Sequence, residues 1–262
     1  MSAPADRWEA GARYDPFVGR WSRLVARQFL PWLEAPNGGA WLDVGSGTGA
    51  LAEAVLELAE PVSVAGVDPS PGMVEHARRQ VPGADFEVGD AQALAFPTAA
   101  FDAVVSALVL NFVPDPALAA SEMRRVARPR GRVAAYVWDY GDGMQMLRSF
   151  WDAAVALDPG AGALDQGPRF PLCRPKPLRE LWEDAGLSGV EVRALEVPTR
   201  FRDFDDYWEP FLGGQGPAPG YCVALPAQRQ EALRERLRRA LPAGPDGAIE
   251  LTARAWAVRG VK

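Results

Sequence analysis

The stretch Trp41-Leu-Asp-Val-Gly-Ser-Gly-Thr-Gly-Ala-Leu51 decides how this chain folds. Residues 40–44 form a short apolar run, which predicts a buried β-strand. Three glycines follow at alternate positions, and residues 50–56 then place apolar side chains at helical spacing. A strand, a glycine turn and a helix together set free backbone N–H groups and a positive helix end beside a ligand. The stretch therefore predicts a nucleotide-like cofactor at this turn.

The spacing of the glycines indicates which cofactor is bound. Dinucleotide-binding turns carry Gly-x-Gly-x-x-Gly, whereas this chain has Gly45, Gly47 and Gly49, preceded by Asp43. An acidic residue at the strand end suits a ligand with a cationic amine and no phosphates. The pattern resembles the first motif of the class I S-adenosylmethionine (SAM) methyltransferases. For this motif alone, a strand–helix turn that binds nothing is the alternative.

A second acidic residue follows the next apolar run. Residues 62–67 predict a strand that ends at Asp68, about twenty residues beyond the glycines. A carboxylate there can accept hydrogen bonds from both hydroxyls of a ribose. The alternative is that Asp68 only caps the helix that begins near Ser70. Pro69 and Met73 are further cofactor candidates, and Met73 would pack against the adenine.

The resemblance implies the rest of the cofactor site. After a strand predicted for residues 84–88, an acid and the next backbone N–H meet the adenine in this family. The remaining cofactor candidates are Ser46 in the glycine turn, Asp90 and Ala91 at the adenine, Ser106 and Leu108 facing the methionine portion, and Tyr14 and Arg20 on the first helix. Residues 14–33 predict that first helix as an amphipathic one, which Pro31 kinks or ends.

The order of the elements predicts the fold. Strands and helices alternate as far as Trp138, and residues 249–258 alternate as a final antiparallel strand would. We expect an α/β protein with a doubly wound, mostly parallel, seven-stranded Rossmann-like sheet and helical lid insertions in a single domain. Its expected parts are a helical cap at 1–36, a cofactor-binding core at 37–138, a lid or connector at 139–186, and C-terminal strands at 187–262 with a helical insertion at 201–245.

A family block also covers the passage from residue 101 to residue 138. It resembles the Phe-Asp…helix…Pro-Gly-Gly arrangement of these methyltransferases, with a turn at 129–131 before a strand that starts at Arg132. Arg130 stands where a glycine is usual. This departure affects a turn and not the cofactor site.

Composition limits the range of partners. The chain has 262 residues, 48% of them hydrophobic, and a net charge of -6, which argues against general affinity for nucleic acid or anionic membranes. No apolar run approaches the roughly 20 residues of a membrane span, and no signal peptide is recognisable. The single histidine and the two cysteines lack metal-ligand spacing, so no metal is expected. We expect a cytoplasmic monomer or homodimer that acts on a small molecule.

The sequence indicates the acceptor only by its general chemical class. The resemblance implies direct displacement, in which the acceptor attacks the sulfonium methyl group and S-adenosylhomocysteine leaves, so alignment matters more than a protein nucleophile. Segments 14–33, 139–177 and 201–241 carry aromatic residues that would enclose a small apolar or aromatic acceptor. The acceptor candidates are Asn111, Trp138, Asp139, Tyr140, Tyr207 and Trp208. An ordinary buried helix face is the alternative for the last two, and an ordinary loop for Asp139 and Tyr140.

Two other functions fit parts of the pattern. An NAD-dependent oxidoreductase would also have an acid after the second strand, although its glycine spacing differs from the one found here. A catalytically silent protein of the SAM fold would retain the cofactor pocket and lack an open acceptor site. Binding of S-adenosylhomocysteine in preference to NAD would distinguish a methyltransferase from the oxidoreductase. Turnover of an acceptor would distinguish it from the catalytically silent protein.

Overall fold

The computed structural model describes residues 19–35, 37–214 and 216–262. These residues form a seven-stranded sheet with the order β3-β2-β1-β4-β5-β7-β6. The strands are β1 (Ala40–Val44), β2 (Ser63–Asp68), β3 (Asp85–Val88), β4 (Phe101–Ala107), β5 (Ala127–Trp138), β6 (Ser188–Phe201) and β7 (Ile249–Val261). The first five pair in parallel, and β7 lies antiparallel between β5 and β6. The predicted doubly wound sheet with an antiparallel last strand is confirmed.

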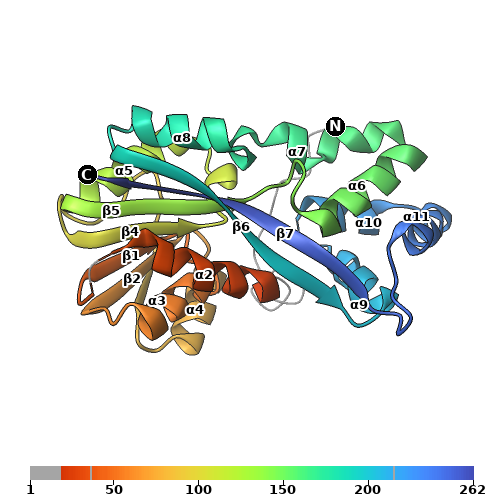
Figure 1. The fold of residues 1–262 in the computed structure, drawn as a ribbon, viewed down its shortest axis with the longest axis horizontal. Coiled ribbons are helices and arrows are strands. Elements are labelled where there is room, and N and C mark those ends of the chain that lie inside the picture. Colours follow the sequence, from red (N-terminus) through yellow and green to blue (C-terminus); the bar gives the residue numbers. More distant parts are fainter. Residues whose placement is uncertain (1–18, 36, 215) are drawn as a thin grey trace.

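Helices cover both faces of this sheet, as Figure 1 shows. One face carries α2 (Arg20–Leu33), α3 (Ala50–Leu58) and α4 (Pro71–Gln80), and the other carries α5 (Pro116–Val126) and α8 (Pro175–Asp184). Successive residues of a strand point to opposite faces of the sheet and therefore pack in different hydrophobic cores. Trp41 packs in the core under α2, α3 and α4, and Leu42 packs in the core under α5 and α8. The central strands are therefore buried on both faces, which explains their nearly continuous apolar sequences.

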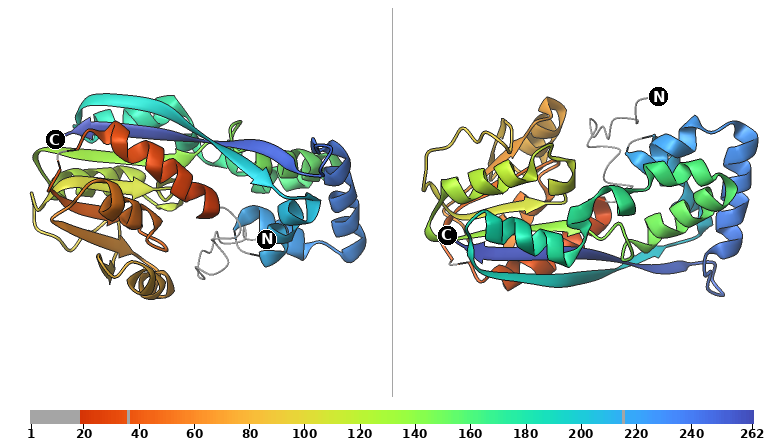
Figure 2. Two further views of the ribbon diagram at one scale, coloured as in Figure 1. Left: turned by 60° about the horizontal axis from the view of Figure 1, so that its bottom comes forward. Right: turned by 90° about the horizontal axis from the view of Figure 1, so that it is seen from above.

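The antiparallel pair β6 and β7 extends beyond the parallel strands and carries a group of helices at its far end (Figure 1 and Figure 2). These helices are α6 (Gln145–Leu157), α9 (Phe204–Trp208), α10 (Pro217–Ala224) and α11 (Ala227–Ala240). Shorter helical segments are η2 (Leu110–Phe112), η3 (Pro159–Leu164), α7 (Gln166–Arg169), η4 (Pro171–Cys173) and η5 (Glu209–Gly213). None of the helices in the described ranges is both long enough and apolar enough to cross a membrane.

Several element boundaries differ from the predicted ones. The fifth strand starts at Ala127, because Ala127 pairs with Phe101 before the register shifts and Arg132 pairs with Ala103. The expected turn thus lies within the strand, and Arg130 adopts a φ of 67°, which explains why a glycine suits this position. The strands β6 and β7 are longer than predicted: residues 198–201 of β6 pair with β7 beyond the parallel core, and residues 259–261 of β7 pair with β5 within it. In α2, Pro31 lies in the last turn and the helix ends at Leu33.

Candidate functional site

A cavity of about 460 Å³ opens at the carboxyl ends of the parallel strands. It is lined by residues that follow or end β1, β2, β3, β4 and β5, and Ser22 of α2 contributes to its wall. This is the position at which open α/β sheets bind ligands. The predicted residues that line it are Gly45, Ser46, Gly47, Asp68, Pro69, Met73, Asp90, Ala91, Leu108, Trp138 and Tyr140.

The glycine turn is shaped by positive φ angles. Gly45, Gly47 and Gly49 have φ values of 75°, 51° and 86°. A Cβ on Gly45 would lie 2.5 Å from Val109 Cγ2, whereas one on Gly47 would meet nothing within 4 Å. Gly49 does not line the cavity and begins α3 as an N-cap residue with no side chain to cap the helix. The turn is therefore open on its ligand side.

Asp68 joins the glycine turn to the next helix. Its Oδ2 accepts a hydrogen bond from the Gly47 N–H at 2.9 Å, and its Oδ1 accepts one from the Ser70 N–H at 2.9 Å. Burial raises the pKa of this carboxyl, and the two backbone donors act in the opposite direction. Ser70, and not Asp68, is the N-cap of α4, since its side chain accepts from the Met73 N–H. Each carboxylate oxygen keeps a lone pair for a ligand hydroxyl.

Asp43 lies behind the glycine turn and does not line the cavity. It is 1% exposed, and within the described residues neither carboxylate oxygen accepts a hydrogen bond of normal geometry. Burial and, secondly, the charge of Asp68 raise its pKa to about 7, and the backbone N–H of Ala52 offsets only part of this. Ser106 is also buried away from the lining, with an unpaired hydroxyl among the described atoms. A carboxylate without partners is a costly feature, which a nearby cationic ligand would relieve.

The adenine candidates lie at the end of β3. Asp90 and Ala91 line the cavity, together with Gly89 and Gln92, which were not predicted. The Asp90 carboxylate accepts hydrogen bonds from the backbone N–H and the side-chain amide of Gln92, and these hydrogen bonds lower its pKa. Asp90 is therefore an ionised acceptor held in a fixed orientation at the rim.

Arg20 is placed elsewhere than predicted. Its Nη1 donates to Asp206 Oδ1 at 3.2 Å, and its guanidinium lies 4.4 Å from the Trp21 ring centroid and 4.9 Å from that of Phe201. It does not line the cavity, because it joins α2 to α9 instead. Tyr14, the other candidate on this segment, lies outside the described residues.

The acceptor candidates separate into two groups. Trp138 and Tyr140 line the cavity, and Asn111 does not. Asp139 is buried and bound to Arg254 Nη2 at 2.6 Å and Trp256 Nε1 at 3.1 Å, so it is not available as a base. These contacts come from β7, far from Asp139 in the sequence.

Tyr207 and Trp208 belong to the hydrophobic core and not to the cavity lining. Tyr207 is fully buried, and its hydroxyl donates to the Met146 carbonyl at 2.9 Å. Trp208 packs in parallel with Phe204. Both residues therefore lie on an ordinary buried helix face, which was the alternative to a role in acceptor binding.

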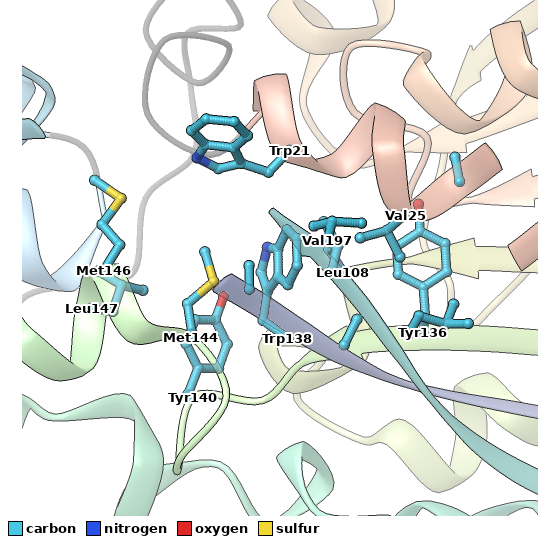
Figure 3. Packing of buried hydrophobic residues seen from close by; sticks show 14 of the residues in the cluster. Trp21, Val25, Leu108, Tyr136, Trp138, Tyr140, Met144, Met146, Leu147 and Val197 are labelled. Carbon is cyan, nitrogen blue, oxygen red and sulfur yellow. The ribbon is translucent and has the colours of Figure 1, made fainter. Parts of the chain in front are cut away.

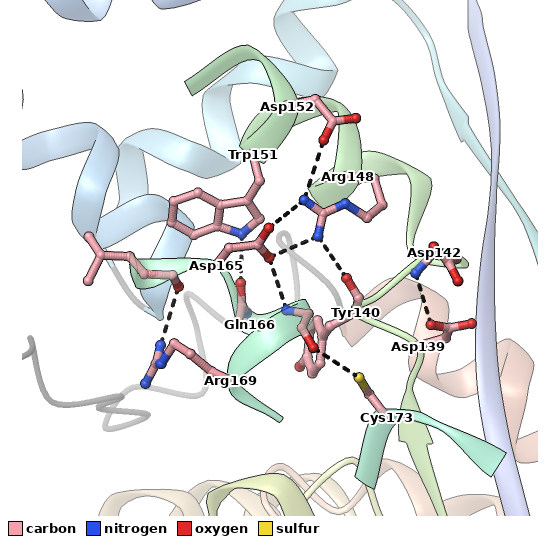
Figure 4. A network of polar contacts seen from close by, with 12 residues as sticks. Asp139, Tyr140, Asp142, Arg148, Trp151, Asp152, Asp165, Gln166, Arg169 and Cys173 are labelled. Atoms are coloured by element: carbon pink, nitrogen blue, oxygen red, sulfur yellow. Dashed lines mark hydrogen bonds and ion pairs between the residues drawn. The ribbon is translucent and has the colours of Figure 1, made fainter. Parts of the chain in front are cut away.

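A polar network fixes the loop that bears Tyr140 (Figure 4). Arg148 donates to both oxygens of Asp165 at 2.8 and 2.6 Å and to the Tyr140 carbonyl at 3.0 Å. Asp165 Oδ1 also accepts from the Gly167 N–H at 2.9 Å. The loop after β5 is thereby held against the segment before α7, which keeps Tyr140 in the cavity wall.

Other lining residues were missed by the sequence analysis. Tyr136 lines the cavity two residues before Trp138, so the period of two along β5 is a signal that could have found it. Phe112, Val113 and Pro114 come from the connection after β4, and Ser22 from α2. No local pattern marks those four positions.

The chain was compared with protein families and curated proteins. Residues 42–135 match the model of a methyltransferase domain family. A 2-methyl-6-phytyl-1,4-hydroquinone methyltransferase of Synechocystis sp. is 32% identical over 186 residues, which cover 69% of this chain and 57% of that relative. The match thus spans little more than half of the relative's length.

Solved structures share the fold. The YcgJ protein of Bacillus subtilis has a TM-score of 0.58 at 19% identity, covering 91% of this chain and 98% of that chain. A phosphoethanolamine N-methyltransferase of Haemonchus contortus, solved with S-adenosyl-L-methionine, has a TM-score of 0.57 at 17% identity, covering 95% of this chain and 57% of the other. At these identities the likeness concerns the fold alone. The match of residues 42–135 to the methyltransferase domain family, together with the Synechocystis relative, confirms the resemblance of this chain to the class I S-adenosylmethionine-dependent methyltransferases.

Proposed function

We propose that this protein transfers the methyl group of S-adenosylmethionine to a small, apolar or aromatic acceptor and releases S-adenosylhomocysteine. The observation that carries the proposal is the charge of the site. Among the described residues that line the cavity there are two carboxylates, Asp68 and Asp90, and no lysine or arginine. The unpaired Asp43 is buried outside the lining, near enough to Asp68 for the charge of Asp68 to raise its pKa. A ligand with sulfonium and ammonium charges fits this field, and a pyrophosphate does not.

The chain offers a partner to each portion of the cofactor. Asp68, already oriented by the Gly47 and Ser70 N–H groups, would accept from the ribose hydroxyls. Asp90 and Ala91 would meet the adenine edge, with Met73 against its face. The open glycine turn would admit the methionine portion close to the backbone, and Asp43 would offset its ammonium charge. When bound, the cofactor supplies a methyl group on a positively charged sulfur.

The acceptor would lie at the β4–β5 side of the cavity. Leu108, Phe112, Tyr136, Trp138 and Tyr140 make this part of the wall largely aromatic. Such a wall excludes water and aligns a flat acceptor with the methyl group, which supplies much of the acceleration of a displacement. Asp139 is held by Arg254 and does not act as a base. The Synechocystis relative, which is named for a hydroquinone, supports a small aromatic acceptor.

Cofactor binding is the first test. We expect titration calorimetry to detect micromolar binding of S-adenosylhomocysteine and no binding of NAD. Comparable affinity for NAD would overturn the proposal in favour of an oxidoreductase, which the comparisons do not favour. Methyl transfer from SAM to a panel of small aromatic acceptors then separates an enzyme from a catalytically silent protein.

The remaining expectations belong to the same proposal. The chain would act as one methyltransferase domain, as a monomer or homodimer, in the cytoplasm and without a nucleic-acid partner. The net charge of -6 supports the last point. Size-exclusion chromatography with light scattering tests the oligomeric state, and a labelled RNA in the same buffer tests the absence of nucleic-acid binding.

A further inference from the structure

Phe170 packs against two aromatic residues of the cavity wall. It is the C-cap residue of α7, is 8% exposed and does not itself line the cavity. Its ring centroid lies 5.2 Å from that of Phe112, at an interplanar angle of 76°, and 5.8 Å from that of Tyr140, at 57°. Phe112 and Tyr140 both line the cavity. One buried ring outside the lining thus contacts two rings of the wall.

The two wall residues come from different segments of the chain. Phe112 belongs to η2, after β4, and Tyr140 follows β5. Figure 3 shows the rings of Tyr136, Trp138 and Tyr140 on one side of β5 and the loop after it, so Tyr140 continues the aromatic wall that the strand begins. Edge-to-face and tilted ring pairs at these distances are favourable beyond the area that they bury. Phe170 therefore holds the two segments of the wall relative to each other.

The segment that bears Phe170 is also anchored to the backbone of Tyr140. Arg148 binds both Asp165 and the Tyr140 carbonyl, and Asp165 accepts the Gly167 N–H. A Cβ on Gly167 would lie 3.0 Å from the Tyr140 carbonyl oxygen, so the two backbones are in close contact. The backbone of Tyr140 is thus held through Arg148, and its ring is held through Phe170. The ring contact can therefore be altered while the loop stays in place.

We infer that Phe170 is a positioning residue that limits the width of the acceptor site by holding Phe112 and Tyr140 in place. This inference rests on the proposed function and goes beyond it by naming a residue that selects acceptors by size. Protein interiors are close-packed, so a wall ring moves outward only when the side chain behind it becomes smaller. A smaller side chain at position 170 gives both rings room to retreat, and the site then admits a wider aromatic molecule.

Two neutral probes of different width, phenol and 1-naphthol, test this inference. Their dissociation constants are measured by equilibrium dialysis in the presence of saturating S-adenosylhomocysteine. We expect Phe170→Leu to raise the affinity for 1-naphthol relative to phenol about tenfold over the parent protein, the effect of burying roughly two further methylene-sized groups. The affinity for S-adenosylhomocysteine should stay that of the parent, because Phe170 does not line the cavity.

Phe150→Leu is the matched control. Phe150 is fully buried in the same hydrophobic core, and its ring contacts Trp151, Phe211 and Tyr221, none of which lines the cavity. Both substitutions exchange the same two side chains in one core, so both should lower the melting temperature. Only Phe170→Leu should change the ratio of the two probe affinities. A merely structural role of Phe170 would leave that ratio the same in both variants.

The outcomes distinguish this inference from the proposed function. A parent protein that does not bind S-adenosylhomocysteine contradicts the proposed function. When it does bind, a ratio that is equal in Phe170→Leu and the parent overturns this inference alone, as does an equal increase in Phe150→Leu or the absence of probe binding to all three proteins. If Phe170→Leu does not fold, Phe170→Met replaces it and should also raise the ratio, because it keeps more of the volume but yields to a wider probe.

Discussion

Asp43→Asn removes a charge that the fold leaves uncompensated. Asp43 is 1% exposed, and no described group forms an ordinary hydrogen bond or ion pair with its carboxylate. Burial and the nearby Asp68 raise its pKa from 3.8 to about 7. Asparagine has nearly the same shape and no charge at any pH. The substitution therefore isolates the cost of burying the charge.

The size and sign of the effect follow from the pKa. Below about pH 4 the carboxyl is neutral in both the folded and the unfolded protein, so it costs nothing. Between pH 4 and 7 the folded state binds the proton more tightly, and the free energy of unfolding falls as pH rises. Above pH 7 the loss is complete, at roughly 4 kcal/mol for a pKa of about 7 in the folded protein. The ligand-free Asn variant should escape this loss.

Urea unfolding of the ligand-free proteins at pH 5 and pH 8 measures this difference. We expect Asp43→Asn to exceed the parent in free energy of unfolding by about 2 kcal/mol at pH 5 and by about 4 kcal/mol at pH 8. Its affinity for S-adenosylhomocysteine should fall. Asp102→Asn is the control with the opposite sign, because hydrogen bonds from the Ala40 N–H and Arg128 lower the Asp102 pKa and make its ionised form stabilising. Equal or lower stability of Asp43→Asn at pH 8 would refute the reasoning.

Four further predictions use other parts of the site. Asp68→Ala should weaken S-adenosylhomocysteine binding by about 1.5–3 kcal/mol for each lost charge-assisted hydrogen bond, and parent-like calorimetric affinity in a folded variant would restrict Asp68 to a structural role. Gly45→Ala should lower both cofactor affinity and the melting temperature, because its φ is 75° and its Cβ would lie 2.5 Å from Val109 Cγ2. Arg148→Met should lower the free energy of unfolding by roughly 3 kcal/mol in urea titrations, since it leaves the largely buried Asp165 carboxylate without its cation; an unchanged midpoint would contradict this. Chelation with EDTA should leave S-adenosylhomocysteine affinity unchanged, because the described residues contain no group of three or more metal-ligating side chains, and a loss that magnesium restores would disprove it.

The sequence by itself determined the core of the fold and the cofactor end of the cavity. Strand periodicity, the glycine turn and the acids after the first strands are local signals, and parallel strands bring their carboxyl ends to one edge. Asp68 and Asp90 therefore meet at the cavity because of the topology alone. The alternation of side chains along β5 places Tyr136 on the same face as Trp138, so the period of two also predicts that Tyr136 lines the cavity.

Only the tertiary structure decided where the remaining side chains lie. Arg20 binds Asp206, 186 residues away, and Asp139 binds Arg254, 115 residues away, so neither contact is written in a local pattern. The aromatic residues around Tyr207 are compatible with either a lid or a buried core, so the sequence does not distinguish the two. The burial of Tyr207 follows from the long β6–β7 pair, which places α9 against α6. The final position of Asp43 behind the turn depends on the packing around it, because an acid at a strand end is compatible with either side of the backbone. Local sequence sets the conformation of a segment, whereas the surroundings of its side chains are set by segments that are distant along the chain.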